Sequence, residues 1–178
     1  MEIIMIAGLK RSGKDTFGDL LNNHLTDADV NVLKIGFADA MKTIISVTLG
    51  ITEQQLDERK NDTSFPHRGY LQRFGSDAMK PIFGEYVWSN IVNDRIRQED
   101  PDVVIITDFR FPVECDNMII SPNTVRVDRA SVTPDPGFIH ISEKALDGFK
   151  FHDTIKNDGS LEDLNVSAME YLIHKGFI

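Results

Sequence analysis

The feature that most restricts how this chain can fold is an apolar segment that runs directly into glycines and cations. Residues 1–7 read MEIIMIA, and residues 8–16 read GLKRSGKDT. The second stretch has the G-x-x-x-x-G-K spacing of a phosphate-binding loop, in which glycines let backbone N–H groups turn inward. The sequence therefore predicts a buried strand over 3–7, an anion-binding loop, and a helix over about 13–25 that adds its positive end. A glycine-rich turn with incidental cations is the alternative.

One position in the loop departs from the usual pattern. Ser or Thr normally follows the Lys directly, but here Asp15 follows Lys14 and Thr16 comes next. Lys14 is expected to neutralise β- and γ-phosphate oxygens, and Thr16 to supply the hydroxyl near the phosphates or magnesium. Asp15 has two open interpretations: it holds a metal-bound water or contacts the acceptor, or it is a first-turn charge that favours the helix dipole.

Strand and helix patterns alternate along the rest of the chain. They predict further strands over 31–37, 103–107 and 124–128, and helices over 38–49, 70–83 and 85–98, with a short helix and a loop over 53–69. Ser160, with Asp163 three residues later, forms a capping-box pattern that opens a last helix. One α/β domain over 1–178, with a central, mostly parallel sheet flanked by helices in three layers, is the economical prediction.

Composition narrows the class of ligand. The net charge is −9, which disfavours a nucleic-acid polymer as partner because phosphate contacts are made chiefly by Lys and Arg. No apolar run reaches the roughly 20 residues of a membrane helix. The one cysteine, Cys115, excludes an internal disulfide and fits a reducing, cytoplasmic compartment. The anion site is then a local positive pocket for a small phosphorylated ligand.

A second group of candidates lies in the segment VVIITDFRFPVE. Asp108 follows a buried strand, where a magnesium-organising carboxylate belongs in such folds. Alternate residues of an extended segment share a side, so Asp108 and Arg110 can point into one cleft. Ligands of α/β sheets bind at this carboxyl end of the strands. The alternative is a helix-capping Asp108 with a solvated Arg110.

Two predicted helices carry further candidates. In GFADAMK, Asp39 is either a helix cap or an acceptor contact, and Lys42 either meets a phosphate or is a solvated charge. In LQRFGSD, Arg73 and Asp77 are four residues apart and would share one face of an α-helix. Arg73 could bind a monophosphate bidentately, and an ordinary surface ion pair is the alternative.

Together these stretches resemble the phage-type deoxynucleoside monophosphate kinases, a family of P-loop kinases. The matching stretches extend over residues 8–164 and are GLKRSGKDT, GFADAMK, LQRFGSDAMK, VVIITDFRFPVECD, HISE and IKNDGSLEDL. The resemblance implies the three-layer P-loop kinase fold with a small lid. It also implies ATP- and Mg²⁺-dependent phosphoryl transfer to a deoxynucleoside 5′-monophosphate, by a viral enzyme in the host cytoplasm.

The resemblance assigns a role to each candidate. The ATP-binding residues would be Gly8, Lys10, Arg11, Ser12, Gly13, Lys14, Asp15 and Thr16, with Asn157 on the adenine side. The catalytic residues would be Lys14, Asp108, Arg110 and Arg129, with Thr16 and Asp108 at the metal. The acceptor nucleotide would contact Asp39, Lys42, Arg73, Asp77, Trp88, Asp108, Arg110 and Glu114.

Some of these roles have competing interpretations. Trp88 could stack on the base of the acceptor, but it also fits the apolar stripe of its helix. Asn157 and Gly159 equally fit a turn and a helix cap. Arg126 and Arg129 are alternative lid arginines, since both precede the Pro- and Gly-rich excursion over 130–149 that is expected to close over the ligands. His140, Ser142 and Glu143 would lie in that lid.

The motifs leave the acceptor and the oligomeric state open. Phosphomevalonate kinases have a similar KRSGKD loop, and dephospho-coenzyme A is another acceptor of P-loop kinases. A nucleotide switch or an ATPase with a protein partner would belong to a different class. Base preference, ribose against deoxyribose, and a homodimer against a monomer stay undecided.

Overall fold

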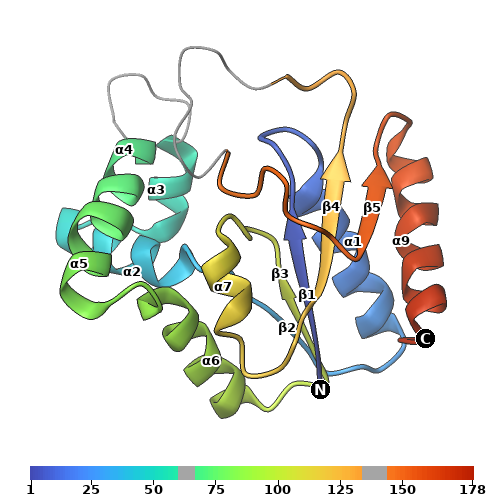
Figure 1. The fold of residues 1–178 in the computed structure, drawn as a ribbon, viewed down its shortest axis with the longest axis horizontal. Coiled ribbons are helices and arrows are strands. Elements are labelled where there is room, and N and C mark those ends of the chain that lie inside the picture. Colours follow the sequence, from blue (N-terminus) through green and yellow to red (C-terminus); the bar gives the residue numbers. More distant parts are fainter. Residues whose placement is uncertain (60–66, 134–143) are drawn as a thin grey trace.

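The computed structural model describes residues 1–59, 67–133 and 144–178, which form one sheet between layers of helices (Figure 1). The strands are β1 (Glu2–Ala7), β2 (Val32–Lys34), β3 (Val103–Ile106), β4 (Asn123–Asp128) and β5 (Asp153–Lys156). Their order is β2-β3-β1-β4-β5, and every neighbouring pair is parallel. The predicted parallel sheet is confirmed. The short edge strand β5 was not predicted.

The predicted helices are present, with one change of backbone geometry. They are α1 (Lys14–Asp27), α2 (Asp39–Leu49), α3 (Glu53–Glu58), α4 (His67–Gln72), α5 (Lys80–Phe83), α6 (Val87–Glu99), α7 (Pro112–Asp116) and α9 (Leu161–Lys175). The short helix α7 was not predicted. A π-helical segment over Arg73–Met79 joins α4 to α5, so the α-helix expected over 70–83 is interrupted. π-Helical turns recur at functional sites of proteins.

Each face of the sheet is covered by a different set of helices. Alternate residues of a strand point to opposite faces, and β1 is buried on both. Ile4 and Ile6 belong to the core shared with α1 and α9, whereas Ile3 and Met5 belong to the core shared with α6. The predicted three-layer arrangement is therefore confirmed.

The carboxyl ends of β1, β3 and β4 lead into the segments that carry the candidate residues. β1 continues into the glycine-rich loop, β3 into the turn before α7, and β4 into the segment that begins at Arg129. Because β1 pairs with both β3 and β4, these three segments leave the sheet next to one another.

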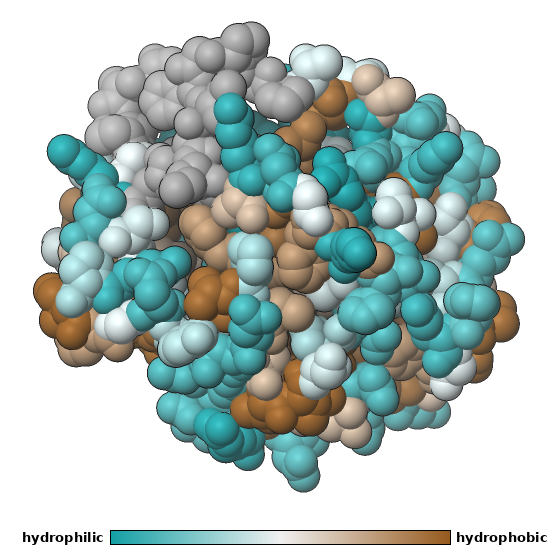
Figure 2. Space-filling view, viewed as in Figure 1, coloured by the Kyte–Doolittle hydropathy of each residue, from teal (hydrophilic) through white to brown (hydrophobic). Residues whose placement is uncertain are grey.

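Figure 2 shows the hydropathy of one face of the molecule. On the face seen in Figure 2, hydrophilic residues cover most of the molecule, and hydrophobic residues form separate small patches. Within the described ranges, we find no helix with both the length and the apolar character that crossing a membrane requires.

Candidate active site

The loop between β1 and α1 has the backbone of an anion-binding turn. Gly13 has a left-handed φ of 92°, and Arg11 has a φ of 69°, which costs a residue with a Cβ roughly 1–2 kcal/mol. The N–H of Ser12 donates to the carbonyl of Leu9 at 3.0 Å, which closes the turn. The N-cap residue of α1 is Gly13, which has no side chain with which to cap the helix. The first N–H groups of α1 are therefore available to an anion.

Lys14 and Asp15 form an ion pair at the start of α1. Nζ of Lys14 lies 2.7 Å from Oδ2 of Asp15, and the Lys14 side chain is largely buried. Burial acts to raise the pKa of Asp15, but the hydrogen bond and charge of Lys14, a hydrogen bond with Thr107 and the charge of Lys34 outweigh it and hold the pKa below its ordinary value. Asp15 thus stays ionised and connects the loop to the end of β3, while Thr16 is exposed beside it.

Asn157 contacts the glycine-rich loop from the turn before α9, and its expected role beside adenine stays a prediction. Its side chain is 8% exposed, and Nδ2 donates to the carbonyl of Ser12 at 2.8 Å. A Cβ at Gly13 would collide with this Nδ2 atom, so the two segments are in tight contact. Asn157 is engaged in holding the loop. The turn-and-cap interpretation holds for its neighbours, because Ser160 and Asp163 form the predicted capping box.

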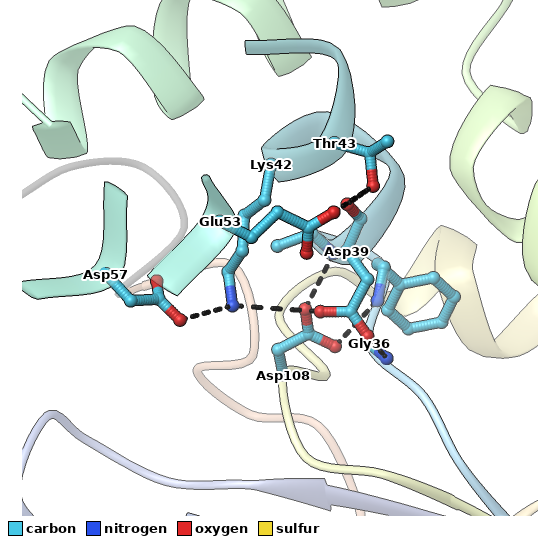
Figure 3. Close-up of polar contacts among 9 residues, drawn as sticks. Gly36, Asp39, Lys42, Thr43, Glu53, Asp57 and Asp108 are labelled. Carbon is cyan, nitrogen blue, oxygen red and sulfur yellow. Dashed lines mark hydrogen bonds and ion pairs between the residues drawn. The ribbon is translucent and has the colours of Figure 1, made fainter. Parts of the chain in front are cut away.

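Asp108 connects the end of β3 to the start of α2. Its Oδ1 accepts the N–H of Phe37 at 2.9 Å and its Oδ2 accepts the N–H of Ala38 at 2.8 Å (Figure 3). A Cβ at Gly36 would lie 2.9 Å from Oδ2, so a larger residue there would push the Asp108 carboxylate out of its present position. Burial raises the pKa of Asp108, although the two N–H groups and the charge of Arg110 act against it. Asp108 therefore holds the turn that leads into α2 and lies close to Arg110.

Lys42 is held between two carboxylates and is not a solvated charge. Its Nζ lies 3.7 Å from Oδ1 of Asp39 and 3.4 Å from Oδ2 of Asp57, and its side chain is 20% exposed (Figure 3). Burial acts to lower the pKa of Lys42, but the charges of Asp57 and Asp39 raise it. Oδ2 of Asp39 also accepts the N–H of Gly36 at 2.7 Å. Sequence reasoning missed Asp57, because a polar short helix gave no sign of this contact.

Glu114 shapes the turn that carries Arg110. It is 8% exposed, and its Oε2 accepts the N–H groups of Arg110 at 2.9 Å and Phe111 at 3.0 Å. Burial raises the pKa of Glu114 to about 7. Lys80, which the sequence analysis did not single out, lies here with Nζ 4.3 Å from the centre of the Phe111 ring. Lys80 is the last residue of the stretch LQRFGSDAMK, and this position was the feature of the sequence that could have identified it as a site residue.

The residues expected on the 70–83 helix and at Trp88 lie differently from the prediction. Arg73 and Asp77 lie in a π-helical segment instead of the expected α-helix, and both side chains are exposed. Trp88 is 3% exposed, and its Nε1 donates to the carbonyl of Gly75 at 3.3 Å. Its ring belongs to the core that also contains Met5, so the expected stacking of Trp88 on a base is not supported.

The excursion over 130–149 is described only at its two ends. His140, Ser142 and Glu143 lie outside the described residues. At the first end, the N–H of Ala130 donates to Oδ1 of Asp158 at 2.6 Å. At the second, the rings of Phe149 and Phe109 meet edge to face with centroids 5.3 Å apart.

The two candidate lid arginines differ in their contacts. Nε of Arg126 lies 2.7 Å from Oδ1 of Asp128, and its guanidinium lies over the ring of Phe151. Arg129 is exposed at the start of the excursion. Arg129 directly follows the carboxyl end of β4, and its side chain lies at the surface.

In the described ranges, no three His, Cys, Asp or Glu side chains are grouped closely enough to hold a metal ion. Mg²⁺ is usually bound by one or two protein oxygens together with phosphate oxygens and water. The hydroxyl of Thr16 and the carboxylates of Asp15 and Asp108 are oxygen donors of the kind that Mg²⁺ prefers, so this donor set fits a magnesium–phosphate complex.

Comparison with known proteins gives a consistent assignment. A family model described as deoxynucleotide monophosphate kinase matches residues 25–167. The deoxynucleoside-5′-monophosphate kinase of Escherichia phage T5 is 35% identical over 66 residues, which are 35% of this chain and 26% of that protein. The match thus spans about a quarter of the length of that relative.

A solved structure supports the fold. A shikimate kinase from Aquifex aeolicus is similar with a TM-score of 0.50 and 16% identity, and the match covers 98% of each chain. A mutant APS kinase from Mycobacterium tuberculosis has a TM-score of 0.49 and 11% identity, with 97% of this chain and 96% of that chain covered. At these identities the shikimate kinase supports the architecture alone, which is that of a P-loop kinase.

Proposed function

Because this chain belongs to the deoxynucleotide monophosphate kinase family, we propose that it transfers the γ-phosphoryl group of ATP to a deoxynucleoside 5′-monophosphate. The observation that carries the proposal is the pairing of β1 with β3, which places the glycine-rich loop beside the Asp108–Arg110 turn. A donor site and an acceptor site in contact are what transfer between two nucleotides requires.

The donor site is the loop over residues 8–16. Its left-handed Gly13 and the uncapped start of α1 offer N–H groups to a polyphosphate. Lys14 adds the charge that neutralises β- and γ-phosphate oxygens, and its ion pair with Asp15 holds the ammonium group at the start of the helix. Arg129 is the candidate for the lid arginine that stabilises the transferring phosphoryl group.

The proposed acceptor site is the β3–α7 turn, which lies beside the glycine-rich loop. Arg110 is the candidate ligand for the acceptor phosphate, because a guanidinium binds phosphate oxygens bidentately. Arg73 and Asp77 on the π-helical segment are exposed and are proposed to contact the acceptor nucleotide. Asp39 and Lys42 contribute through the start of α2, which Asp108 holds in place.

Little covalent chemistry is asked of the protein. An oxygen of the acceptor phosphate forms the new bond to the γ-phosphorus, and the β–γ bridging oxygen leaves with ADP. The acceptor oxygen is already largely ionised near neutral pH, so no strong general base is needed. Alignment of the two nucleotides and cancellation of charge on the γ-phosphoryl oxygens are the main contributions.

Magnesium fits this arrangement as a complex with the nucleotide. Thr16 and Asp108 are the proposed protein oxygens at the metal, and Asp15 is a candidate for holding a metal-bound water. When bound, the ion would neutralise phosphate charge and fix the geometry of the polyphosphate. The protein residues supply the remaining charge.

A coupled assay tests the proposal with each deoxynucleoside monophosphate offered in turn. We expect ADP and the matching diphosphate to form in equal amounts with at least one of them. Ribonucleotides, dephospho-coenzyme A and phosphomevalonate serve as competing acceptors in the same assay. Transfer to one of these alone, or ATP hydrolysis that no acceptor accelerates, would reject the deoxynucleotide assignment in favour of another kinase or an ATPase.

A further inference from the structure

Two consecutive residues in the turn between β5 and α9 are fastened to two different parts of the proposed donor site. Asn157 donates from its side chain to the glycine-rich loop, and Asp158 accepts with its side chain from the segment that follows β4. The turn is itself held by the capping box of Ser160 with Asp163. One dipeptide therefore links the phosphate loop to the beginning of the excursion.

On the loop side, the contact determines the direction of a backbone amide. Nδ2 of Asn157 donates to the carbonyl of Ser12 at 2.8 Å, and both residues are buried. The peptide bond between Ser12 and Gly13 is trans and planar, so the N–H of Gly13 points away from the carbonyl of Ser12. Because the carbonyl points toward Asn157, the N–H of Gly13 points to the other side, where the proposed function places a phosphate.

On the other side, the same turn holds both peptide groups that flank Arg129. The N–H of Asn157 donates to the carbonyl of Asp128 at 2.7 Å. Oδ1 of Asp158 accepts the N–H of Ala130 at 2.6 Å. The carbonyl of Arg129 also accepts the N–H of Val132 at 3.0 Å, which closes a turn. The backbone of Arg129 is thereby fixed although its side chain is exposed.

We infer that Asn157 and Asp158 are positioning residues that set the Gly13 amide and Arg129 at a fixed separation across the donor phosphates. Neither residue touches the nucleotide in this account. Asn157 acts through the peptide of Ser12 and Gly13, and Asp158 acts through the backbone of Arg129. The inference rests on the proposed function, because it assigns both groups to the same triphosphate.

The Asn157 part is tested by binding, without any turnover. Asn157→Asp has nearly the same size but places a carboxylate against the carbonyl of Ser12. We expect its Kd for ATP, measured by calorimetry, to rise roughly tenfold, as for loss of one well-formed hydrogen bond to the loop. Asn93→Asp is the matched control: Asn93 is 4% exposed and donates to the carbonyl of Asn117 at 2.7 Å, away from the loop. It should lower the melting temperature and leave the Kd unchanged.

The role of Asp158 is tested by measuring kcat and the Kd for ATP separately in Asp158 variants. Asp158→Ala removes the acceptor for the N–H of Ala130, and we expect kcat to fall roughly tenfold with little change in the Kd for ATP. Asp158→Asn keeps a carbonyl oxygen at the same place and should restore most of kcat. Thermal melting of each variant shows whether the fold is retained.

The outcomes distinguish this inference from the proposed function. A wild-type Kd in Asn157→Asp, or a shift equal to that of Asn93→Asp, overturns the loop role of Asn157. Equal kcat in Asp158→Ala and the wild type, or no recovery in Asp158→Asn, overturns the role of Asp158. If the wild type binds ATP but phosphorylates no deoxynucleotide, the proposed function and the Asp158 part fail together, while the calorimetric comparison still decides the Asn157 part.

Discussion

Oε2 of Glu114 accepts a hydrogen bond from the backbone N–H of Arg110 at 2.9 Å, so a buried acid holds the turn that presents the candidate acceptor-binding arginine. The same oxygen accepts the N–H of Phe111. The contact explains why an acid is buried beside Asp108 at the start of α7. The charge state of Glu114 therefore affects both the turn that carries Arg110 and the stability of the protein.

The stability of the protein is expected to fall as pH rises toward neutrality because of Glu114. Burial, aided by the charge of Asp108, raises the pKa of Glu114 from its ordinary value of 4.5 to about 7. Between these values the folded state binds a proton that the unfolded chain releases. This contribution to stability is therefore full below about pH 4.5 and is lost as pH rises through about 7.

Glu114→Gln separates this effect from other titrations. The amide keeps an oxygen for both N–H groups and cannot ionise. By the linkage relation, we expect the free energy of unfolding of the variant to exceed that of the wild type by on the order of 2–3 kcal/mol at about pH 8, and the two to converge toward about pH 4.5. Urea unfolding at a series of pH values measures the difference, and two parallel curves would show that Glu114 does not titrate in this way.

Lys14→Ala is expected to abolish phosphoryl transfer while the fold survives. The Lys14 side chain pairs with Asp15 at the edge of the loop and is not part of either hydrophobic core. A loss of about 10³-fold or more in kcat is the scale for removing a cation that contacts the transferring phosphoryl group. Arg95→Ala is a matched control, because Arg95 also pairs with a nearby carboxylate, Glu99, on a helix outside the site. Wild-type turnover in Lys14→Ala contradicts the donor assignment.

Arg110→Ala is expected to raise the KM of the acceptor more than the KM of ATP. Loss of charge-assisted hydrogen bonds to a phosphate corresponds to roughly a 10- to 100-fold increase. Arg110→Lys keeps the charge but not the bidentate geometry. Its acceptor KM should therefore lie between the values of the wild type and of Arg110→Ala. Steady-state kinetics with each substrate varied in turn gives both constants. An acceptor KM that stays at the wild-type value in Arg110→Ala removes Arg110 from the acceptor site.

Lys42→Met is expected to destabilise the contact between α2 and α3. The substitution keeps most of the apolar stem and leaves Asp39 and Asp57 without the ammonium group that now lies near both. Because Lys42 is partly exposed, we expect a loss of roughly 1–2 kcal/mol in the free energy of unfolding, less than for a fully buried pair. The double variant Lys42→Met/Asp57→Asn should recover part of this lost free energy of unfolding. Additive losses in the double variant would show that the pair is not coupled.

The donor loop was predictable because its signal is local. The spacing of Gly8, Gly13 and Lys14 describes one turn and the start of one helix, and the structure forms both. The capping box at Ser160 is equally local and is confirmed. Continuous apolar runs such as 103–106 predicted strands that are buried on both faces. A strand of this kind indicates a parallel sheet between two layers of helices, which is the arrangement observed.

The remaining parts of the site depend on contacts between distant segments. Asn157 is 145 positions from Ser12, so its neighbouring residues indicate only a turn. An apolar helical stripe fits Trp88 equally well in a core or against a base, and only the packed structure decides. The π-helical segment changes the pairing of backbone groups without changing the apolar pattern. The edge strand β5 is short and half-exposed, which leaves a weak signal.

The most direct test of the whole account is a crystal structure with a non-hydrolysable ATP analogue and a deoxynucleoside monophosphate bound together. The account predicts the β- and γ-phosphates within hydrogen-bond distance of the N–H of Gly13 and Nζ of Lys14, with the acceptor phosphate at Arg110 in line with the γ-phosphorus. A triphosphate bound away from the loop over residues 8–16, or an acceptor phosphate that does not approach the β3–α7 turn, would contradict it.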